Sequence, residues 1–325
     1  MKRTRTTAAL AGLAAVAMLA AGCGGGDSAS GSDGTYRLAF IEGVTGDAFY
    51  VTMGCGIQQK AKELGATVSI QGAQKFDPTL QTPVLQSVVA SRPDAILIAP
   101  TDAKSMEQPI KQATAAGIKV VLVDTTLENT GDVVSSIASD NQGGGAAAFK
   151  AIQQLAPNGG KVLVIDNQPG ISTSDARTKG FDDAAKADSK YVNLGVQYVQ
   201  NDPAKAAQIV TAALQKDPDI VGIFATNLFG ATGASTGVRQ AGKQGAVKIV
   251  GFDAGSDQVK ALQEGTIQAL IAQQPATIGT DGVDQAIKAL KGESTEKAIQ
   301  TGFTIVTKDN LNSTEGQAAL YKSSC

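Results

Sequence analysis

Short apolar runs alternate with amphipathic segments from Tyr36 onward, and this alternation restricts the fold more than any other feature of the chain. The hydrophobicity of these runs is continuous, which is typical of strands buried on both faces of a parallel sheet. The segments between them have helical spacing, as in residues 49–64, where Phe49, Met53 and Ile57 share one face. This alternation predicts an α/β fold with helices on both faces of its sheets. The predicted strands are residues 36–41, 66–71, 95–99, 120–123, 161–165, 192–199, 220–225, 248–252 and 269–272.

The alternation restarts after about Ser139, where a predicted strand at 133–138 links a first series of strands and helices to a second. Two successive series of similar length predict two similar three-layer lobes, each with a parallel, doubly wound sheet, rather than one long sheet. Proline and glycine mark expected helix starts and ends, respectively, at Pro78 and Pro203 and at Gly65 and Gly117.

The first 34 residues have the layout of an export signal followed by a tether. Lys2, Arg3 and Arg5 precede an apolar run at 8–21, which is too short to span a bilayer as a helix. The sequence Leu-Ala-Ala-Gly-Cys that ends at Cys23 resembles the lipobox of bacterial lipoproteins, in which the signal is cut before a cysteine that carries the lipid. We therefore expect a signal peptide at 1–22, lipidation of Cys23 and a flexible Gly- and Ser-rich tether at 23–34. An ordinary cleaved signal with a coincidental cysteine is the alternative.

Composition excludes several classes of function. The net charge is −2 and no basic cluster lies outside the leader, so the sequence predicts no nucleic-acid partner. The chain contains no histidine, which excludes Ser-His-Asp and Cys-His catalysis and most zinc sites. We predict no catalytic residue, no metal and no cofactor.

The remaining cysteines form a candidate pair. If Cys23 carries lipid, Cys55 in the first helix and Cys325 at the last position are left, and in an exported protein such a pair is a candidate disulfide. The bridge would attach the end of the chain to the first lobe. Two unpaired thiols are the alternative.

Polar side chains follow the predicted strands in both series. In open α/β sheets, ligands bind beyond the carboxyl ends of the strands. If the two lobes face each other, these residues line one cleft, although any single one could instead cap a helix or form a turn. They are Glu42, Asp47, Asp124, Asp166, Asn167, Asn227, Asp253, Gln273 and Gln274.

A set of short motifs follows the predicted strands along the chain. They are residues 46–50 (GDAFY), 99–102 (APTD), 123–125 (VDT), 137–141 (IASDN), 177–181 (RTKGF), Asn227, 250–253 (VGFD) and 271–275 (IAQQP). In this order and at these intervals, these landmarks resemble the ribose- and galactose-type periplasmic sugar-binding proteins of ABC transporters, whose two-lobed fold also forms the core of the lac repressor family. The resemblance covers about Tyr36 to Asn310.

The resemblance implies a set of sugar-contacting residues whose chemistry suits a polyol. Carboxylates accept from vicinal hydroxyls, Arg177 presents a planar fork of donors, and amides both donate and accept. An aromatic ring can lie against the apolar face of a sugar, although we expect Phe49 or Tyr50 to serve mainly in core packing. For Arg177 the alternative is a salt bridge to a neighbouring aspartate, and for the carboxylates a structural role. The implied residues are Asp47, Phe49, Tyr50, Asp124, Thr125, Arg177, Asn227, Asp253 and Gln273.

Three departures from the ribose-specific pattern argue against ribose itself. Thr125 stands where those members have an arginine, Asp47 where they have an asparagine, and Asn201 where they place a pocket aromatic. The acidic balance favours a neutral, hydroxyl-rich or even cationic ligand over a sugar phosphate or a sugar acid.

Two motifs suggest other functions but lack the necessary context. Residues 233–237 match the G-x-S-x-G nucleophile elbow, yet they lie within a predicted helix, and the chain has no histidine to act as base. Gly143, Gly144 and Gly145 open a helix without a following GK[ST], so close packing is the better interpretation of this glycine run.

The predicted function is capture of a neutral sugar or polyol by hinge closure, for delivery to an ABC permease, by a monomer anchored to the outer face of the membrane. We expect crossings between the lobes near Ser139, Gln274 and Thr304. A receptor that reports to a membrane sensor and an enzyme on the same scaffold are the alternatives. The expected parts are an N-terminal lobe (35–138 plus 275–303), a C-terminal lobe (139–274 plus 304–312) and a tail (313–325).

Overall fold

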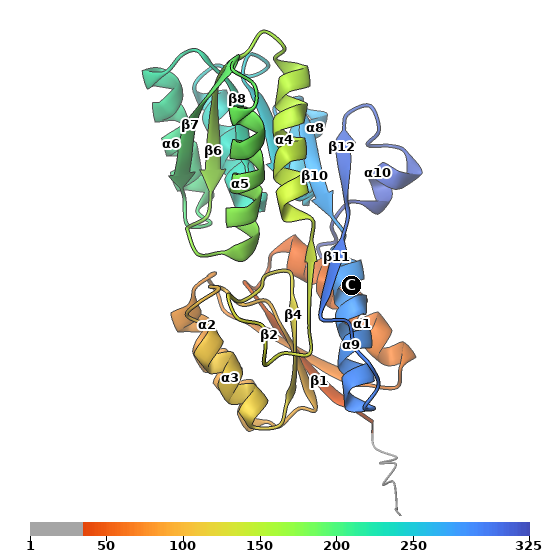
Figure 1. Ribbon diagram of the computed structural model, residues 1–325. Helices are drawn as coiled ribbons and strands as arrows, with labels where there is room; N and C mark the ends of the chain where they lie inside the picture. The colour runs from red at the N-terminus through yellow and green to blue at the C-terminus, as the bar shows by residue number, and fades with distance from the viewer. Residues whose placement is uncertain (1–34) are drawn as a thin grey trace, which may run out of the picture. The chain divides into compact units, whose positions relative to one another are not determined.

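Two separate sheets organise the chain in the computed structural model, which describes residues 35–325 (Figure 1). The predicted signal peptide, the lipidation site at Cys23 and the whole tether lie outside the described residues. The first sheet has the order β11-β5-β4-β3-β1-β2, and all of its pairings are parallel. Its strands are β1 (Arg37–Glu42), β2 (Thr67–Gly72), β3 (Ala95–Ile98), β4 (Lys119–Val123), β5 (Ser135–Ser139) and β11 (Ala298–Thr301).

Helices cover both faces of the first sheet and complete lobe one. Leu38 and Phe40 of β1 pack in the hydrophobic core under α1 (Ala48–Glu63) and α9 (Pro275–Leu290). Ala39 and Ile41 point to the opposite face, into the core under α2 (Pro78–Ala90) and α3 (Glu107–Ala115). Every residue of the strand from Leu38 onward is therefore buried, as its continuous hydrophobicity predicts.

The second sheet has the order β12-β10-β9-β8-β6-β7 and forms lobe two. Helices α4 and α5 pack on one face, and α6 and α7 pack on the other, with α8 against α7 and α10 against β12. The strands are β6 (Gly160–Asp166), β7 (Tyr191–Tyr198), β8 (Ile220–Ala225), β9 (Lys248–Phe252), β10 (Ala269–Gln273) and β12 (Phe303–Thr307). The helices are α4 (Asn141–Leu155), α5 (Ser172–Lys186), α6 (Pro203–Lys216), α7 (Leu228–Gln240), α8 (Ser256–Gln263) and α10 (Thr314–Ala318).

The predicted fold class of two α/β lobes is confirmed, with one difference at the edges of the sheets. The sequence pattern does not predict β11 and β12, and β12 runs antiparallel to β10. Both are edge strands with several half-buried or exposed residues, so they lack the continuous apolar run that identifies the inner strands.

The chain passes between the two sheets at three places. These lie between β5 and α4 at Asp140, between β10 and α9 at Gln274, and between β11 and β12 at Gly302. A disulfide also joins Cys55 in α1 to Cys325, the pairing considered from the sequence. Among residues 35–325, no helix combines the length and the apolar character that crossing a bilayer requires.

Candidate functional site

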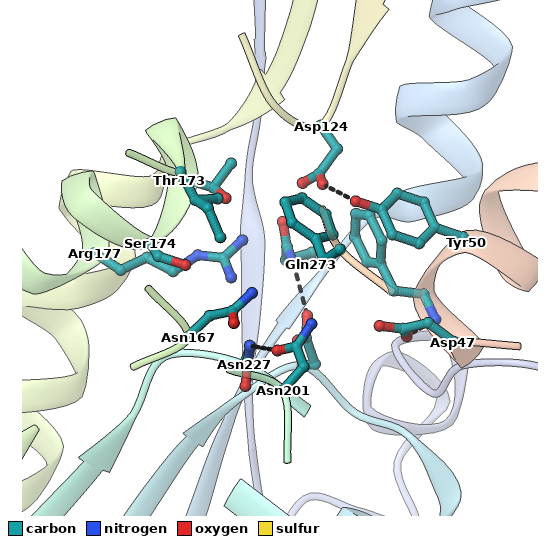
Figure 2. Close-up of a pocket in the computed structure, with 14 residues that line it drawn as sticks. Asp47, Tyr50, Asp124, Asn167, Thr173, Ser174, Arg177, Asn201, Asn227 and Gln273 are labelled. Atoms are coloured by element: carbon teal, nitrogen blue, oxygen red, sulfur yellow. Dashed lines mark hydrogen bonds between the residues drawn. The ribbon is translucent and has the colours of Figure 1, made fainter. Parts of the chain in front are cut away.

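A cavity between the two lobes collects side chains from the carboxyl ends of both sheets (Figure 2). Lobe one contributes residues from the loops after β1, β2 and β4, and lobe two from the loops after β6, β7, β8 and β9. Gln273 joins them from the end of β10. The lining residues of this interlobe cavity are Asp47, Phe49, Tyr50, Phe76, Asp124, Asn167, Ile171, Thr173, Ser174, Arg177, Asn201, Asn227, Asp253 and Gln273.

Arg177 supplies the positive charge of the interlobe cavity, and its position depends on close packing of α4 and α5. A Cβ at Gly145 of α4 would overlap the carbonyl oxygen of Arg177, so only glycine lets the two helices approach this closely. The predicted packing role of this glycine run is thereby explained. The same approach brings Arg177 within reach of Asn141 at the start of α4.

The Arg177 guanidinium is 4% exposed and firmly held. Its Nε donates to Asn141 Oδ1 at 2.8 Å, one Nη donates to the Thr226 carbonyl at 2.8 Å, and its Cζ lies 3.8 Å above the centre of the Phe252 ring. These contacts leave three of its five N–H donors for a ligand, and Figure 2 shows the side chain reaching into the cavity. No salt bridge within 4.0 Å holds Arg177 among the described residues, whereas two aspartates of α5 pair with lysines of the same helix.

Asp124 and Asp253 occupy equivalent positions in the two lobes. Asp124 directly follows β4 and Asp253 directly follows β9, and both have left-handed backbone conformations, with φ of 66° and 79°. Few non-glycine residues adopt this conformation, and aspartate tolerates it better than most. The turn aims each carboxylate into the interlobe cavity instead of along the strand.

The two carboxylates differ in their internal hydrogen bonds. Asp124 accepts one, from the Tyr50 hydroxyl at 2.7 Å. Asp253 accepts three, from Gln273 Nε2 at 2.7 Å, the Leu228 amide at 3.0 Å and the Tyr321 hydroxyl at 3.1 Å. Burial raises the pKa of Asp124 to about 6 and also raises that of Asp253, while the Arg177 charge opposes both shifts.

Asp47 adds a third carboxylate at the N-terminus of α1. It caps this helix by accepting from the Phe49 amide at 2.9 Å. Burial, followed by repulsion from Asp253, raises the pKa of Asp47 to about 7. Near neutral pH this carboxyl can therefore either donate or accept a hydrogen bond.

Amide side chains complete the polar lining. Asn227 caps α7 by accepting from the Gly230 amide at 2.8 Å and donates to Asn201 Oδ1 at 2.6 Å. Gln273 accepts from the Ser139 hydroxyl at 2.8 Å while donating to Asp253. Gln273 therefore links the end of β5 in lobe one to the carboxylate of lobe two.

The sequence predicts that one of the two aromatic residues at the start of α1 serves mainly in core packing, whereas in the structure both combine core packing with lining the cavity. Phe49 and Tyr50 are both buried, and both line the interlobe cavity. Their rings meet edge to face with centroids 5.2 Å apart, so each also belongs to the core. Tyr50 in addition holds Asp124 through its hydroxyl.

The structure does not place Thr125 in the interlobe cavity. Its hydroxyl donates to the Pro100 carbonyl at 2.7 Å, and its side chain is buried in lobe one. Because Asp124 takes the left-handed turn, the next residue points back into the protein. Two other strand-end carboxylates also lie outside the lining, Glu42 and Asp166, the latter accepting from the Thr226 hydroxyl at 2.5 Å.

Sequence reasoning did not identify several lining residues. Phe76 lies in the loop after β2, while Ile171, Thr173 and Ser174 surround the start of α5 after β6. Phe76 follows β2 and the other three follow β6, so the strand-end rule would identify all four if it were extended to the longer loops after these strands. The sequence predicts Asn167 as a strand-end residue of the cleft but not as a sugar contact, and it marks Asn201 only as a departure from the ribose pattern.

The G-x-S-x-G motif lies inside α7, as predicted. Ser235 is in the middle of the helix and donates to the Thr232 carbonyl at 2.9 Å. A nucleophile elbow needs a sharp turn between strand and helix, which this segment does not form.

The lobes also touch outside the interlobe cavity. The Thr126 amide of lobe one donates to the Ser172 hydroxyl of lobe two at 2.8 Å, and the Ala103 amide donates to the Gly170 carbonyl at 3.0 Å. These bonds join loops of opposite lobes and characterise a closed arrangement. No cluster of three or more His, Cys, Asp or Glu side chains with metal-binding geometry occurs in the described part of the chain.

Comparison with known proteins shows which family this chain is similar to. A family described as "Periplasmic binding protein domain" matches residues 38–294. The chain is 31% identical over 281 residues to the ribose import binding protein RbsB of Bacillus subtilis, covering 86% of this chain and 90% of that protein. It also resembles the solved structure of an ABC transporter solute-binding protein from Agrobacterium vitis bound with α-D-tagatopyranose, with a TM-score of 0.86, 41% identity and coverage of 89% and 100% of the two chains. A second such protein from Agrobacterium vitis, with bound D-fucose, has a TM-score of 0.84, 31% identity and coverage of 88% and 100%.

Proposed function

Since the chain belongs to the periplasmic binding proteins that serve sugar ABC transporters, we propose that it captures a neutral monosaccharide or polyol in the interlobe cavity and delivers it to an ABC import permease. The observation that carries this proposal is the placement of Arg177 with Asp124 and Asp253 around one cavity. A sugar that enters a closed cleft must replace every hydroxyl–water bond, because an unpaired buried polar group costs about 1–3 kcal/mol. The cavity offers free guanidinium donors, carboxylate acceptors and amides that do both.

The charges of the cavity argue for an uncharged ligand. Three carboxylates face one guanidinium, so an anionic sugar phosphate or sugar acid would meet repulsion. The relatives bind neutral sugars according to their names, and tagatose and fucose are bound in the two solved structures. Asn201, and Thr125 outside the cavity, stand where ribose-specific members have an aromatic residue and an arginine. We therefore propose a monosaccharide other than ribose.

The mechanism we propose is closure of the two lobes about their crossing segments. A ligand that first binds one lobe gains the contacts of the other only in the closed state, and this difference in affinity shifts the open–closed equilibrium. The permease would then recognise the closed form. We further propose export as a monomeric lipoprotein anchored through Cys23, with residues 24–34 giving the receptor freedom to reach the permease.

A thermal-shift screen tests the proposal. The purified protein, unfolded and refolded to remove any co-purified sugar, is heated with pentoses, hexoses, polyols and inositols in turn. A ligand at a hundred times its Kd stabilises the fold by about 2.7 kcal/mol. Stabilisation by a neutral sugar or polyol supports the proposal, and a response confined to charged or apolar compounds contradicts it.

A matched pair of variants makes this screen specific to the cavity. Arg177→Met should abolish the stabilisation, while Lys179→Met should preserve it, because Lys179 lies on the same helix but is exposed and pairs only with Asp183. Equal responses from the two variants would mean that the sugar binds elsewhere.

A further inference from the structure

The segment 313–325 connects the two lobes in addition to the three crossings. Its first part is attached to lobe two, where the Tyr321 amide donates to the Ala254 carbonyl at 3.1 Å and the Tyr321 side chain is buried. Its last part is attached to lobe one. The Lys322 amide donates to the Thr52 hydroxyl of α1 at 2.7 Å, and Cys325 is bonded to Cys55 of the same helix. Figure 1 marks the end of this segment beside α1 and α9.

Tyr321 is hydrogen-bonded to two residues that line the interlobe cavity. Its hydroxyl accepts from the backbone amide of Gln273 at 2.9 Å and donates to Asp253 Oδ1 at 3.1 Å. Its ring meets Phe49 of lobe one edge to face, with centroids 5.8 Å apart. Tyr321 does not line the interlobe cavity, so it acts on a ligand through the residues that do.

The geometry of this segment limits how far the lobes can separate. Only Lys322, Ser323 and Ser324 lie between Tyr321 and Cys325, and four residues of extended chain span at most about 13–14 Å. The disulfide adds a Cα–Cα separation of 5.4 Å, so an opening that moved the Cys55 Cα more than about 19 Å from the Tyr321 Cα would have to pull Tyr321 out of its buried site or break the disulfide.

We propose that residues 313–325 act as a disulfide-closed strap that restrains the opening of the lobes, and that Tyr321 is the positioning residue through which the strap fixes Asp253 and Gln273 for the ligand. The strap favours closed or nearly closed forms of the empty protein. The apparent affinity equals the intrinsic affinity multiplied by the fraction of molecules in the binding-competent state. A protein held in closed or nearly closed forms therefore binds more tightly than one that opens freely.

The strap is tested on the ligand-free protein by small-angle X-ray scattering. Two variants release it: Cys55→Ser combined with Cys325→Ser, and an insertion of Gly-Ser-Gly-Ser between Lys322 and Ser323 that keeps the disulfide. Both should increase the radius of gyration of the empty protein, and the sugar should reverse the increase. An unchanged radius in both variants would overturn the strap. This measurement needs no ligand, so it is independent of whether the proposed sugar-binding function holds.

A second experiment measures the affinity of the same variants for a sugar that stabilises the unmodified protein, and it rests on the proposed function. The two released variants should bind it three- to tenfold more weakly, with faster dissociation. Tyr321→Phe should weaken binding about tenfold, and it should also lower Tm because the hydroxyl bonds two buried partners. In protein labelled with ¹³C at aspartate carboxyls, the Asp253 resonance of this variant should titrate at a higher pH, because the carboxylate has lost one donor.

Tyr191→Phe is the matched control for the positioning role. Its hydroxyl is also held inside lobe two, donating to the Ala156 carbonyl at 2.6 Å, but Tyr191 is neither a lining residue nor hydrogen-bonded to one. This control should lower Tm without changing affinity. Equal affinities of the Tyr321→Phe and Tyr191→Phe proteins would overturn the positioning role.

Discussion

The carboxylates of Asp124 and Asp253 stand at matching strand ends, yet the two lobes hold them differently. Each follows a buried strand, adopts a left-handed turn and lies near a tyrosine hydroxyl. In lobe one the tyrosine comes from α1 of the same lobe and provides the single internal bond to Asp124. In lobe two, Tyr321 comes from the strap and is one of three donors to Asp253.

This difference separates a carboxylate that is available from one that is already bonded. Asp124 keeps one oxygen and part of the other for ligand hydroxyls, whereas both oxygens of Asp253 have internal partners. Preorganisation of this kind lowers the entropic cost of binding. Under the proposed function, lobe two would therefore present a fixed site, while lobe one would complete its contacts when the ligand arrives.

Arg177→Met should have the largest effect, because Arg177 serves both carboxylates. We expect a loss of affinity of at least a hundredfold, equivalent to about 2.7 kcal/mol or more, since hydrogen bonds from a charged donor are worth about 1.5–3 kcal/mol each. The pKa values of Asp124 and Asp253 should both rise further once the guanidinium charge is gone. Isothermal titration calorimetry and carboxyl NMR measure the two effects, and a pKa shift of only one carboxyl would show that the guanidinium charge acts on that carboxylate alone.

Asp124→Asn and Asp253→Asn should separate the two lobes. Both substitutions should weaken binding about tenfold or more. Asp253→Asn should also be the less stable variant by about 1–3 kcal/mol, because a single amide oxygen cannot serve three internal donors. Calorimetry for affinity and urea unfolding for stability give the comparison, and equal stabilities would contradict the preorganised character of lobe two.

The sequence predicts the inner strands and the strand-end carboxylates because both follow from local pattern. Asp124 and Asp253 end apolar runs, and the topology of parallel sheets brings such ends together. The direction of a side chain after a strand is not local. Thr125 follows Asp124 directly but points away, because the left-handed turn at Asp124 reverses the chain. Tyr321 follows no predicted strand and lies beyond the last landmark, so no local pattern marks it, and it reaches Asp253 only through tertiary packing.

Asp47 should make the stability of the ligand-free protein fall as pH rises from about 5 to about 8. Its pKa is about 7 in the folded chain and about 4 ordinarily, so folding takes up a proton in this window and stability is lost as pH passes through the folded value. In Asp47→Asn, the free energy of unfolding should decrease over this pH range by on the order of 2 kcal/mol less than in the unmodified protein. Some slope should remain from Glu42 and Asp124, whose pKa values are also raised. Tm measured across pH tests this expectation.

Asp77→Asn is the matched control for the pH profile. Asp77 caps α2 with the same geometry, accepting from the Thr79 amide at 2.7 Å, but its hydrogen bonds with Thr79 lower its pKa. Its contribution is complete above the ordinary value and is lost as pH falls through the folded value. The variant should therefore leave the slope between pH 5 and 8 unchanged, and a matching change in both variants would show that loss of a helix cap, not titration, causes the effect.

Thr125→Val should have the smallest effect on binding. The hydroxyl of Thr125 bonds Pro100 and does not face the cavity, so affinity should change by less than twofold while stability falls by about 1 kcal/mol. A large loss of affinity in calorimetry would return Thr125 to the set of ligand-binding residues.

The disulfide between Cys55 and Cys325 also makes the chain a covalent ring across 270 positions that contains every crossing between the lobes. A protease that cuts one exposed loop anywhere within the ring leaves a single covalent molecule, since both ends of the break stay joined through the sulfur atoms. The nicked protein would separate into two fragments only under reducing conditions. For an extracytoplasmic protein, such a ring converts one cleavage from a loss of half the protein into a local break.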